Sequence, residues 1–209
     1  MADNMDFNGA DSQDAAFDLI PANTLAKVTL TIRPGGAGPE GWLTQSRTSS
    51  AMYLNVEAIV LDGPYARRRV YTRIGFKGKN VNERGEDTYA NRGRALIRGI
   101  LESARGIKAN DQSETARTAR LIRSLGDLSG LDFVAKIGVE KDRNNPEDAG
   151  RNVIKAAISP DHGQYLAVMG AAPTPPASFN TAPASPQGGN YAPPTAETAS
   201  SGNAPFWAR

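Results

Sequence analysis

The stretch LDGPYARRRVYTRIGF, residues 61–76, decides the fold of this chain. It opens with an Asp-Gly-Pro turn signal, passes through three adjacent arginines at 67–69, and then alternates apolar and polar residues. In a strand, this alternation puts Tyr71 and Arg73 on one side. Three adjacent like charges repel one another, so their presence beside a strand indicates a partner that attracts them. The stretch therefore predicts a turn followed by a strand whose outer side is basic and aromatic.

The residues before this stretch complete a three-stranded unit. Residues 51–61, AMYLNVEAIVL, alternate in the same way, and residues 68–76 follow them after a short Gly-Pro turn. Two strands joined by such a turn predict an antiparallel hairpin. Residues 24–33, TLAKVTLTIR, predict an earlier half-buried strand, and the Gly- and Pro-rich residues 34–50 predict a long loop between the two.

Beyond residue 76 the hydrophobic period changes and then returns. Residues 87–107 and 113–125 have apolar side chains at helical spacing, whereas residues 131–142 and 151–159 alternate as strands do. Three strands, a helical segment and two strands form the order of a five-stranded Greek-key barrel of the oligonucleotide-binding (OB) type, with its helices between strands 3 and 4. The sequence thus predicts a mostly β fold with a helical insertion. An α+β sandwich built from the same elements is the alternative.

The two ends of the chain differ in composition from the middle. Residues 1–18 contain five aspartates and no basic residue, which predicts an acidic flexible arm. Residues 171–209 are mostly Pro, Ala, Ser, Thr, Gly and Asn, and such a segment has too little apolar surface to offset the entropy of ordering. We therefore predict a disordered tail there, which leaves residues 19–170 as the folded OB-type domain.

The formal net charge of +2 conceals an uneven distribution of charge. Residues 64–123 contain 15 basic residues against 6 acidic ones. A basic folded unit between an acidic arm and a nearly neutral tail predicts a polyanionic partner. Ordinary solubility charge is the alternative interpretation of the same numbers.

Composition also narrows the compartment and the chemistry. The chain has no cysteine, which excludes disulfides, thiolate metal sites and cysteine nucleophiles. No apolar run approaches the length of about 20 residues that a membrane span needs, and the acidic start does not resemble a secretory signal. We expect a cytoplasmic protein that does not bind membranes.

The same residues resemble a known family. YLNVEAIVLDGPYARRRVYTRIGF, residues 53–76, is similar to the core signature of a family of bacteriophage proteins formerly listed as a domain of unknown function. Residues 19–30 resemble the opening strand of that family, with Asn23 where glycine is more usual, and residues 127–142 and 152–160 resemble its closing hairpin. The resemblance implies an OB barrel and the binding of single-stranded DNA in phage replication and recombination.

Single-stranded nucleic acid binding requires cations for the phosphates and flat aromatic faces for the bases. An OB barrel presents these on strands 2 and 3 and on the loops that join strands 1–2 and 4–5. The candidate nucleic-acid-binding residues at those places are Trp42, Arg47, Tyr53, Arg67, Arg69, Tyr71, Arg73, Lys77, Lys79, Lys141, Arg143 and Arg151.

Several of these residues have a purely structural alternative. Trp42 would equally pack the long loop onto the barrel, and Tyr71 would equally pack across strands. Adjacent arginines alternate faces, so residues 67–69 cannot all touch one ligand surface, and solvation alone would explain them. The arginines between Arg92 and Arg123 fit the solvated face of an amphipathic helix better than a binding groove.

Nothing in the sequence indicates catalysis or a cofactor. His162 is the only histidine and has no partner at metal or nucleophile spacing, and the Gly-rich loop at 34–41 lacks the lysine of a nucleotide-binding loop. We therefore predict a non-catalytic single-stranded DNA-binding protein of phage or mobile-element replication and recombination. The alternatives are an RNA-binding or strand-annealing protein of the same fold, and a structural or adaptor protein whose barrel binds another protein.

The end of the tail, NAPFWAR, carries an aromatic pair at Phe206 and Trp207. Bacterial single-stranded DNA-binding proteins are similar in plan, with a barrel, a low-complexity tail and a partner-docking tip, but their tips are acidic. We predict that this pair docks onto a replication or recombination protein. A terminus without function is the alternative, and a homo-oligomer is compatible with the sequence.

Overall fold

The computed structural model describes residues 9, 18–142, 145 and 147–170. The predictions for the acidic arm before residue 18, for Arg143, and for the tail with Phe206 and Trp207 lie outside the described residues. In the described part, no helix has the length and apolarity needed to cross a membrane.

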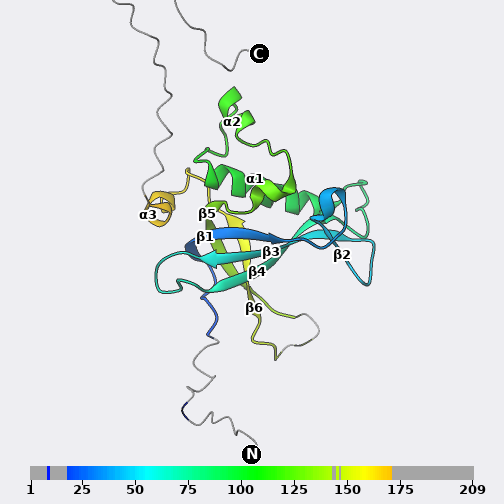
Figure 1. Cartoon of the computed structure of the whole chain (residues 1–209), viewed down its shortest axis with the longest axis horizontal. Helices are drawn as coiled ribbons and strands as arrows, with labels where there is room; N and C mark the ends of the chain where they lie inside the picture. The colour runs from blue at the N-terminus through cyan, green and yellow to red at the C-terminus, as the bar shows by residue number, and fades with distance from the viewer. Residues whose placement is uncertain (1–8, 10–17, 143–144, 146, 171–209) are drawn as a thin grey trace, which may run out of the picture. The chain divides into compact units, whose positions relative to one another are not determined.

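The described chain forms one antiparallel sheet with helices beside it (Figure 1). Its long strand β1 lies at the centre, between β3 and β5, and β4 and β6 form the two ends of the sheet. The short β2 pairs with the first residues of β3. The strands are β1 Thr24–Arg33, β2 Thr44–Gln45, β3 Met52–Val60, β4 Arg69–Lys77, β5 Asp132–Glu140 and β6 Arg151–Ala157.

The predicted strands are confirmed, and the predicted long loop contains two short elements of secondary structure. β1 has the predicted bounds, and β3 and β4 form the predicted antiparallel hairpin. The loop after β1 contains a short 3-10 helix, η2 (Pro39–Gly41), and the unpredicted strand β2. Two residues are too few to give a periodic signal, so this strand could not be found from the sequence.

The sheet is not closed into a barrel. The two edge strands, β4 and β6, approach each other, and the backbone N–H of Ile154 in β6 donates to the Thr72 hydroxyl of β4 at 2.8 Å. Over the described residues no backbone ladder joins these two strands. The expectation of a closed barrel is therefore not met: where β6 meets β4, the Thr72 side chain accepts the hydrogen bond from the β6 backbone in place of a strand carbonyl.

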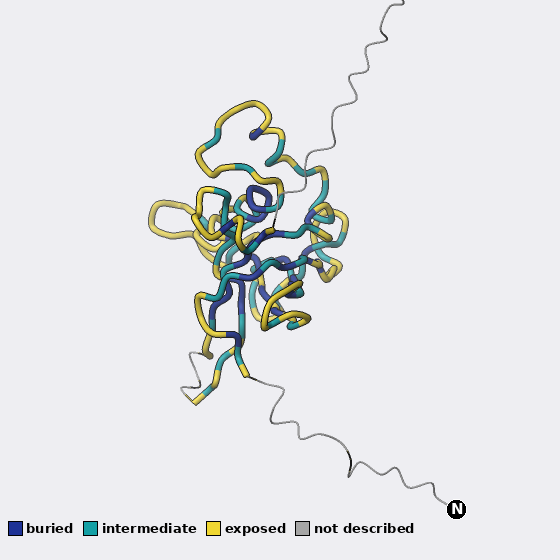
Figure 2. Tube along the Cα trace, turned by 90° about the vertical axis from the view of Figure 1, so that its left-hand side faces the viewer, coloured by how far each residue is buried: buried dark blue, intermediate teal, exposed yellow. Residues whose placement is uncertain are grey.

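The alternating apolar positions of the strands form the core. Val28 and Leu30 of β1, Leu54 and Val56 of β3, and Phe133 of β5 are fully buried, and the buried stretches run through the sheet and the facing side of the first helix (Figure 2). Burying such side chains is the main stabilising contribution to a domain of this size. The hydrophobic alternation that predicted the strands thus corresponds to the side that packs inward.

The helices are α1 Thr88–Ala104, α2 Glu114–Thr118 and α3 Tyr165–Met169, with a second 3-10 helix, η3, at Leu125–Leu128. The helix predicted at 87–107 is confirmed as α1. The helix predicted at 113–125 is wrong in length, because the chain leaves the helix after residue 118. There Arg120 turns inward to Glu102 at 2.7 Å and donates to the carbonyl of Lys108, while Leu121 is 71% exposed.

Asp87 joins the start of α1 to the end of β4. Its carboxylate accepts from the backbone N–H of Ala90 at 2.9 Å, as a helix N-cap does, and from that of Gly78 at 2.6 Å. Both hydrogen bonds lower the pKa of Asp87, and the one from the N–H of Ala90 has the larger effect. The bonds therefore stabilise the fold in the ionised form of the carboxyl group.

We expect Asp87→Ala to lower the melting temperature at neutral pH, and the difference from wild type to shrink in acid. Because the folded pKa lies below the unfolded value of about 3.9, the stabilisation is present above that pH and is lost as pH falls through the folded pKa. Thermal melts from pH 7 to pH 3 measure this. Glu83→Ala on the neighbouring loop is the control, and a difference independent of pH would contradict the prediction.

Candidate nucleic-acid interface

The outer side of the β3–β4 hairpin carries the predicted aromatic and basic residues. The register places Tyr53 opposite Gly75, Asn55 opposite Arg73, and Glu57 opposite Tyr71. Because strand residues alternate, Tyr71 and Arg73 point outward, whereas Thr72 between them is buried. The opening stretch of sequence therefore does present one basic and aromatic side.

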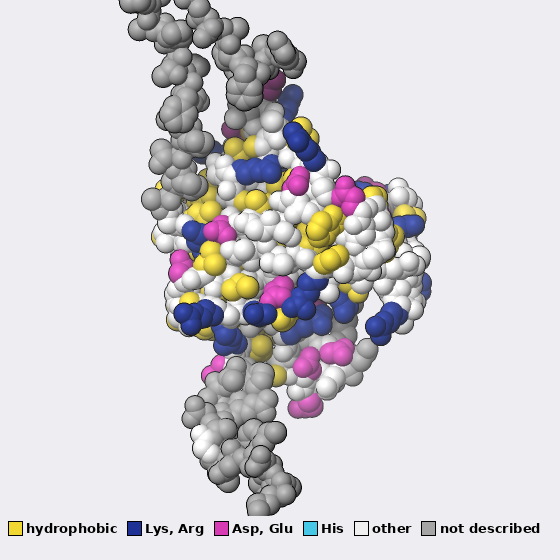
Figure 3. Space-filling model, viewed as in Figure 1, with side chains coloured by type: hydrophobic (Ala, Val, Ile, Leu, Met, Phe, Trp, Pro, Cys, Tyr) yellow, Lys and Arg dark blue, Asp and Glu magenta, His cyan; other side chains and the backbone are white. Residues whose placement is uncertain are grey.

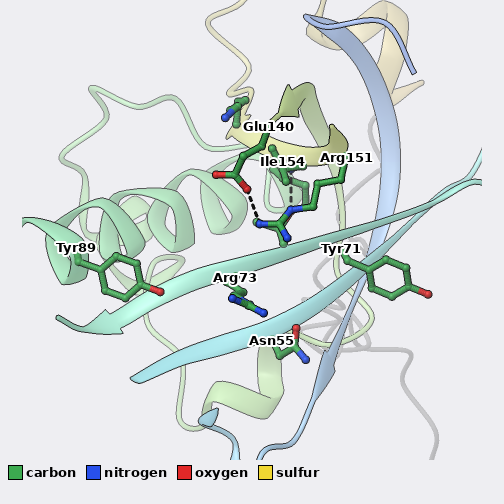
Figure 4. A pocket seen from close by; sticks show the side chains of 10 residues that line it. Asn55, Tyr71, Arg73, Tyr89, Glu140, Arg151 and Ile154 are labelled. Carbon is green, nitrogen blue, oxygen red and sulfur yellow. Dashed lines mark hydrogen bonds and ion pairs between the residues drawn. The ribbon is translucent and has the colours of Figure 1, made fainter. Parts of the chain in front are cut away.

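A groove runs along the open side of the sheet between β4 and β6 (Figure 4). Its larger part has a volume of about 560 Å³, and a second hollow of about 370 Å³ shares Tyr71 and Arg151 with it. We call the two hollows together the β4–β6 groove. The charged and aromatic residues that line them are Arg68, Arg69, Tyr71, Arg73, Tyr89, Glu140, Arg151 and Lys155.

Two tyrosines on this side of the sheet each have an arginine over the ring. The guanidinium carbon of Arg73 lies 5.1 Å from the centre of the Tyr53 ring, and that of Arg33 lies 5.2 Å from the centre of the Tyr71 ring. These distances are within the range of a cation–π interaction. Tyr71 remains 46% exposed, so its ring is held in place by Arg33 while part of it stays accessible to a ligand.

Glu57 holds two of the arginines on the surface. Its side chain is 7% exposed, and it accepts from the guanidinium of Arg33 at 2.9 Å and pairs with that of Arg69 at 2.9 Å. Hydrogen bonding to Glu57 and its charge raise the pKa of Arg33. A buried carboxylate needs such partners. Because two cations share one anion and both stay more than half exposed, the cluster keeps an excess positive charge at the surface.

The opposite wall of the groove, on β6 and the end of β5, is also basic. Arg151 pairs with Glu140 at 2.8 Å. The pKa of Glu140 is lowered, first by the hydrogen bond from Arg151 and also by the charges of Lys155 and Arg73. Glu140 therefore stays ionised at neutral pH, and it neutralises only part of the charge of the three cations around it.

Basic side chains gather over the sheet near β4 in the view of Figure 3, where acidic side chains are fewer.

Several of the helical arginines are held in interactions within the protein. Arg98 and Arg120 both pair with Glu102, at 2.8 and 2.7 Å, and Arg105 donates to the carbonyl of Leu121 at 3.0 Å. These three arginines hold the chain between α1 and η3 together, so we do not include them in the candidate site.

The predicted site residues fall into two groups. The structure brings Tyr53, Arg69, Tyr71, Arg73 and Arg151 to the β4–β6 groove or its immediate border. The others do not line it: Lys77 is the last residue of β4 and Lys79 follows it, Arg67 lies in the turn before β4, and Arg47 lies in the loop before β3. Lys141 follows β5 and lies against Gly150, which lines the smaller hollow. For both groups, contact with nucleic acid stays a prediction.

Trp42 has a packing environment of its own. Its indole N–H donates to Glu40 at 3.1 Å, and its ring lies so close to Gly126 that a Cβ at that glycine would meet Cζ2 at 2.6 Å. The ring also packs against the main core. These contacts favour the interpretation in which Trp42 fixes the loop after β1 onto η3.

Sequence reasoning missed two residues that hold the site's side chains in place, Arg33 and Glu57, and two that line the groove, Tyr89 and Lys155. Arg33 lies on the polar side of β1 and Glu57 on the polar side of β3, so the alternation of each strand could have indicated that both face outward. Tyr89 of α1 enters the groove because the helix packs on Gly75 of β4, where a Cβ would meet the tyrosine ring at 2.7 Å. Lys155 reaches the groove from β6. No local pattern marks these last two positions.

Comparison with known proteins adds no assignment, because no protein-family model, no curated protein and no solved structure matches this chain. The class of protein must therefore be argued from the open antiparallel sheet and the groove at its edge.

Proposed function

We propose that this chain is a non-catalytic single-stranded DNA-binding protein of phage or mobile-element replication and recombination. The observation that supports this most directly is the exposed ring of Tyr71, which lies under Arg33 and lines the groove together with Arg73 and Arg151. Unpaired bases stack on such rings, and the neighbouring cations bind the backbone phosphates. In a duplex the base faces are already stacked, so this arrangement favours single strands.

We further propose that the fold is a partly open member of the OB type. Apart from the two-residue β2, three strands precede α1 and two follow it, which is the order of that fold, and the OB fold is a partly open barrel. The β3–β4 hairpin then takes the place of strands 2 and 3, which carry the ligand in OB proteins. The groove between β4 and β6 lies beside that hairpin, which supports the same assignment.

We also propose that the tail tip, Phe206 and Trp207, docks onto a replication or recombination protein. The aromatic pair follows a long segment that is nearly free of charge, so it adds little to the electrostatic attraction between the chain and DNA. Capture by an apolar pocket on a partner is the chemistry that two adjacent aromatic side chains support.

The proposed function is tested by the affinity of the full chain for labelled oligo-dT, for a duplex of the same length and for oligo-U, measured by fluorescence anisotropy. If four to six phosphates are bound, we expect a slope of log affinity against log salt of roughly −3 to −4, at about −0.7 per phosphate. We expect weaker binding to the duplex.

Three results would count against the proposal. Equal affinity for oligo-U would favour the RNA-binding alternative. Affinity that does not change between low and moderate salt would contradict phosphate binding in the groove. No binding to any of the three ligands would favour an adaptor that binds another protein.

A further inference from the structure

The N-terminal segment of the chain is a second candidate ligand of the β4–β6 groove. It joins the folded part of the chain at one end of that groove. The backbone of Ile20 is held by Asn152 of β6, whose side chain accepts from the Ile20 N–H at 2.9 Å and donates to its carbonyl at 2.8 Å. Ile20 is 1% exposed, so this anchor is part of the core.

The two residues before this anchor lie at the groove. Leu19 lines its smaller hollow, together with Arg69, Tyr71 and Arg151. The guanidinium of Arg68, on the turn that leads into β4, donates to the backbone carbonyl of Asp18. The residues that precede Asp18 therefore depart from a point between the β4 side and the β6 side of the groove.

The arm that departs there has the opposite charge to the groove. Residues 1–17 contain Asp3, Asp6, Asp11 and Asp14 and no basic residue. Most of the charge that lines the groove is positive, and Glu140 is its one carboxylate among the described lining residues. Carboxylates spaced along a chain offer the same kind of charge as the phosphates of a nucleic acid strand, so they suit the same cations.

The arm is also long enough. A chain spans at most about 3.3–3.6 Å per residue, so Asp14 can lie up to about 14 Å from Asp18 and Asp11 up to about 25 Å. Along β6, the four steps from Arg151 to Lys155 extend over about 13 Å, at about 3.3 Å per residue. The cations of the groove are thus within reach of at least two aspartates.

We infer that residues 1–17 occupy the β4–β6 groove when no nucleic acid is bound and that they compete with it. This inference rests on the proposed function, because the groove is taken to be the DNA site. Surface ion pairs are individually weak and are screened by salt. A DNA strand that offers a row of phosphates and stackable bases displaces the arm, whereas a short or weakly charged polyanion does not.

The first experiment detects the arm without any nucleic acid. The chain has no cysteine, so Ala10→Cys gives a single site for a nitroxide label and keeps all the aspartates of the arm. We expect the label to broaden the amide NMR signals of Tyr71, Arg73 and Arg151 at about 50 mM salt, and the broadening to fade at about 300 mM as the Debye length shrinks. The control carries the same label with Asp3, Asp6, Asp11 and Asp14 changed to Asn.

The second experiment measures the competition. Deletion of residues 1–17 should tighten oligo-dT binding by about three- to tenfold at 50 mM salt, and the gain should vanish at 300 mM. The four-Asn variant of the arm should reproduce the gain at unchanged length. Unbroadened signals in the labelled full chain, or equal oligo-dT affinity with and without the arm at 50 mM salt, would overturn the inference. If broadening is seen but no variant binds oligo-dT, the arm occupies the groove and the proposed DNA-binding function is wrong.

Discussion

Gly93→Ala is expected to destabilise this protein by about 3 kcal/mol or more, at the upper end of what overpacking a core costs. A Cβ at position 93 would lie 1.7 Å from the carbonyl oxygen of Gly75 and 2.7 Å from its carbonyl carbon. Both of these are backbone atoms, so no side chain can rotate away, and α1 would have to move off β4. For a chain of this length we expect the melting temperature to fall by roughly 6–12 °C, at about 2–4 °C per kcal/mol.

Gly99→Ala is the matched control, because it makes the same change in the same helix. A Cβ there would lie 3.5 Å from the Cβ of Ala157, which is an ordinary contact. Alanine is favoured over glycine inside a helix by about 0.8–1 kcal/mol. We therefore expect this variant to melt at or above the wild-type temperature. If the Gly93→Ala protein had the melting temperature of the wild type, α1 would not pack on β4 as described.

The contact between Gly93 and Gly75 also positions part of the candidate site. Gly75 is a place on β4 that α1 approaches closely, and a Cβ there would meet the carbonyl oxygen of Tyr89 at 2.6 Å. The absence of side chains at both glycines therefore lets the helix bring Tyr89 to the groove. A change that pushes α1 outward should weaken ligand binding as well as the fold.

The strands could be predicted because their signal is local. Alternation within TLAKVTLTIR gives β1 its bounds, and the Asp-Gly-Pro turn at 62–64 joins β3 to β4. The end of α2 could not be predicted in this way. Leu121 has helical spacing from the residues before it, yet it is exposed, because the long-range pair between Arg120 and Glu102 draws the backbone out of the helix.

The candidate site likewise has residues that a local pattern predicts and residues that it does not. Tyr71 and Arg73 follow from the alternation of one strand, so the sequence alone places them on one side. The partners of these residues depend on the register of other strands: Arg33 reaches Tyr71 only because β1, β3 and β4 lie side by side. The opening between β4 and β6 depends on how the whole sheet curls, which no local pattern encodes.

Tyr71→Ala is expected to have the largest effect on DNA affinity of any single aromatic substitution in the groove. The loss of one stacked base costs about 1–3 kcal/mol, which corresponds to roughly 5- to 150-fold weaker oligo-dT binding. Tyr71 is 46% exposed, so its removal should leave the melting temperature nearly unchanged. The dependence on salt should also stay the same, because no cation is lost. Tyr71→Phe keeps the aromatic face and should bind close to wild type.

Arg73→Ala and Trp42→Ala distinguish this stacking from charge and from packing. Arg73 lines the groove, and if it binds a phosphate its loss should reduce the size of the salt slope by about 0.7. Trp42 packs over Gly126 and against the core, so Trp42→Ala should lower the melting temperature while the folded protein keeps its affinity. The three variants therefore separate in three measurements: affinity at one salt concentration, salt slope and thermal stability. Trp42→Ala would weaken oligo-dT binding more than Tyr71→Ala only if a base stacked on the Trp42 ring. That result would place the nucleic acid over the loop after β1, and the groove between β4 and β6 would not be the binding site.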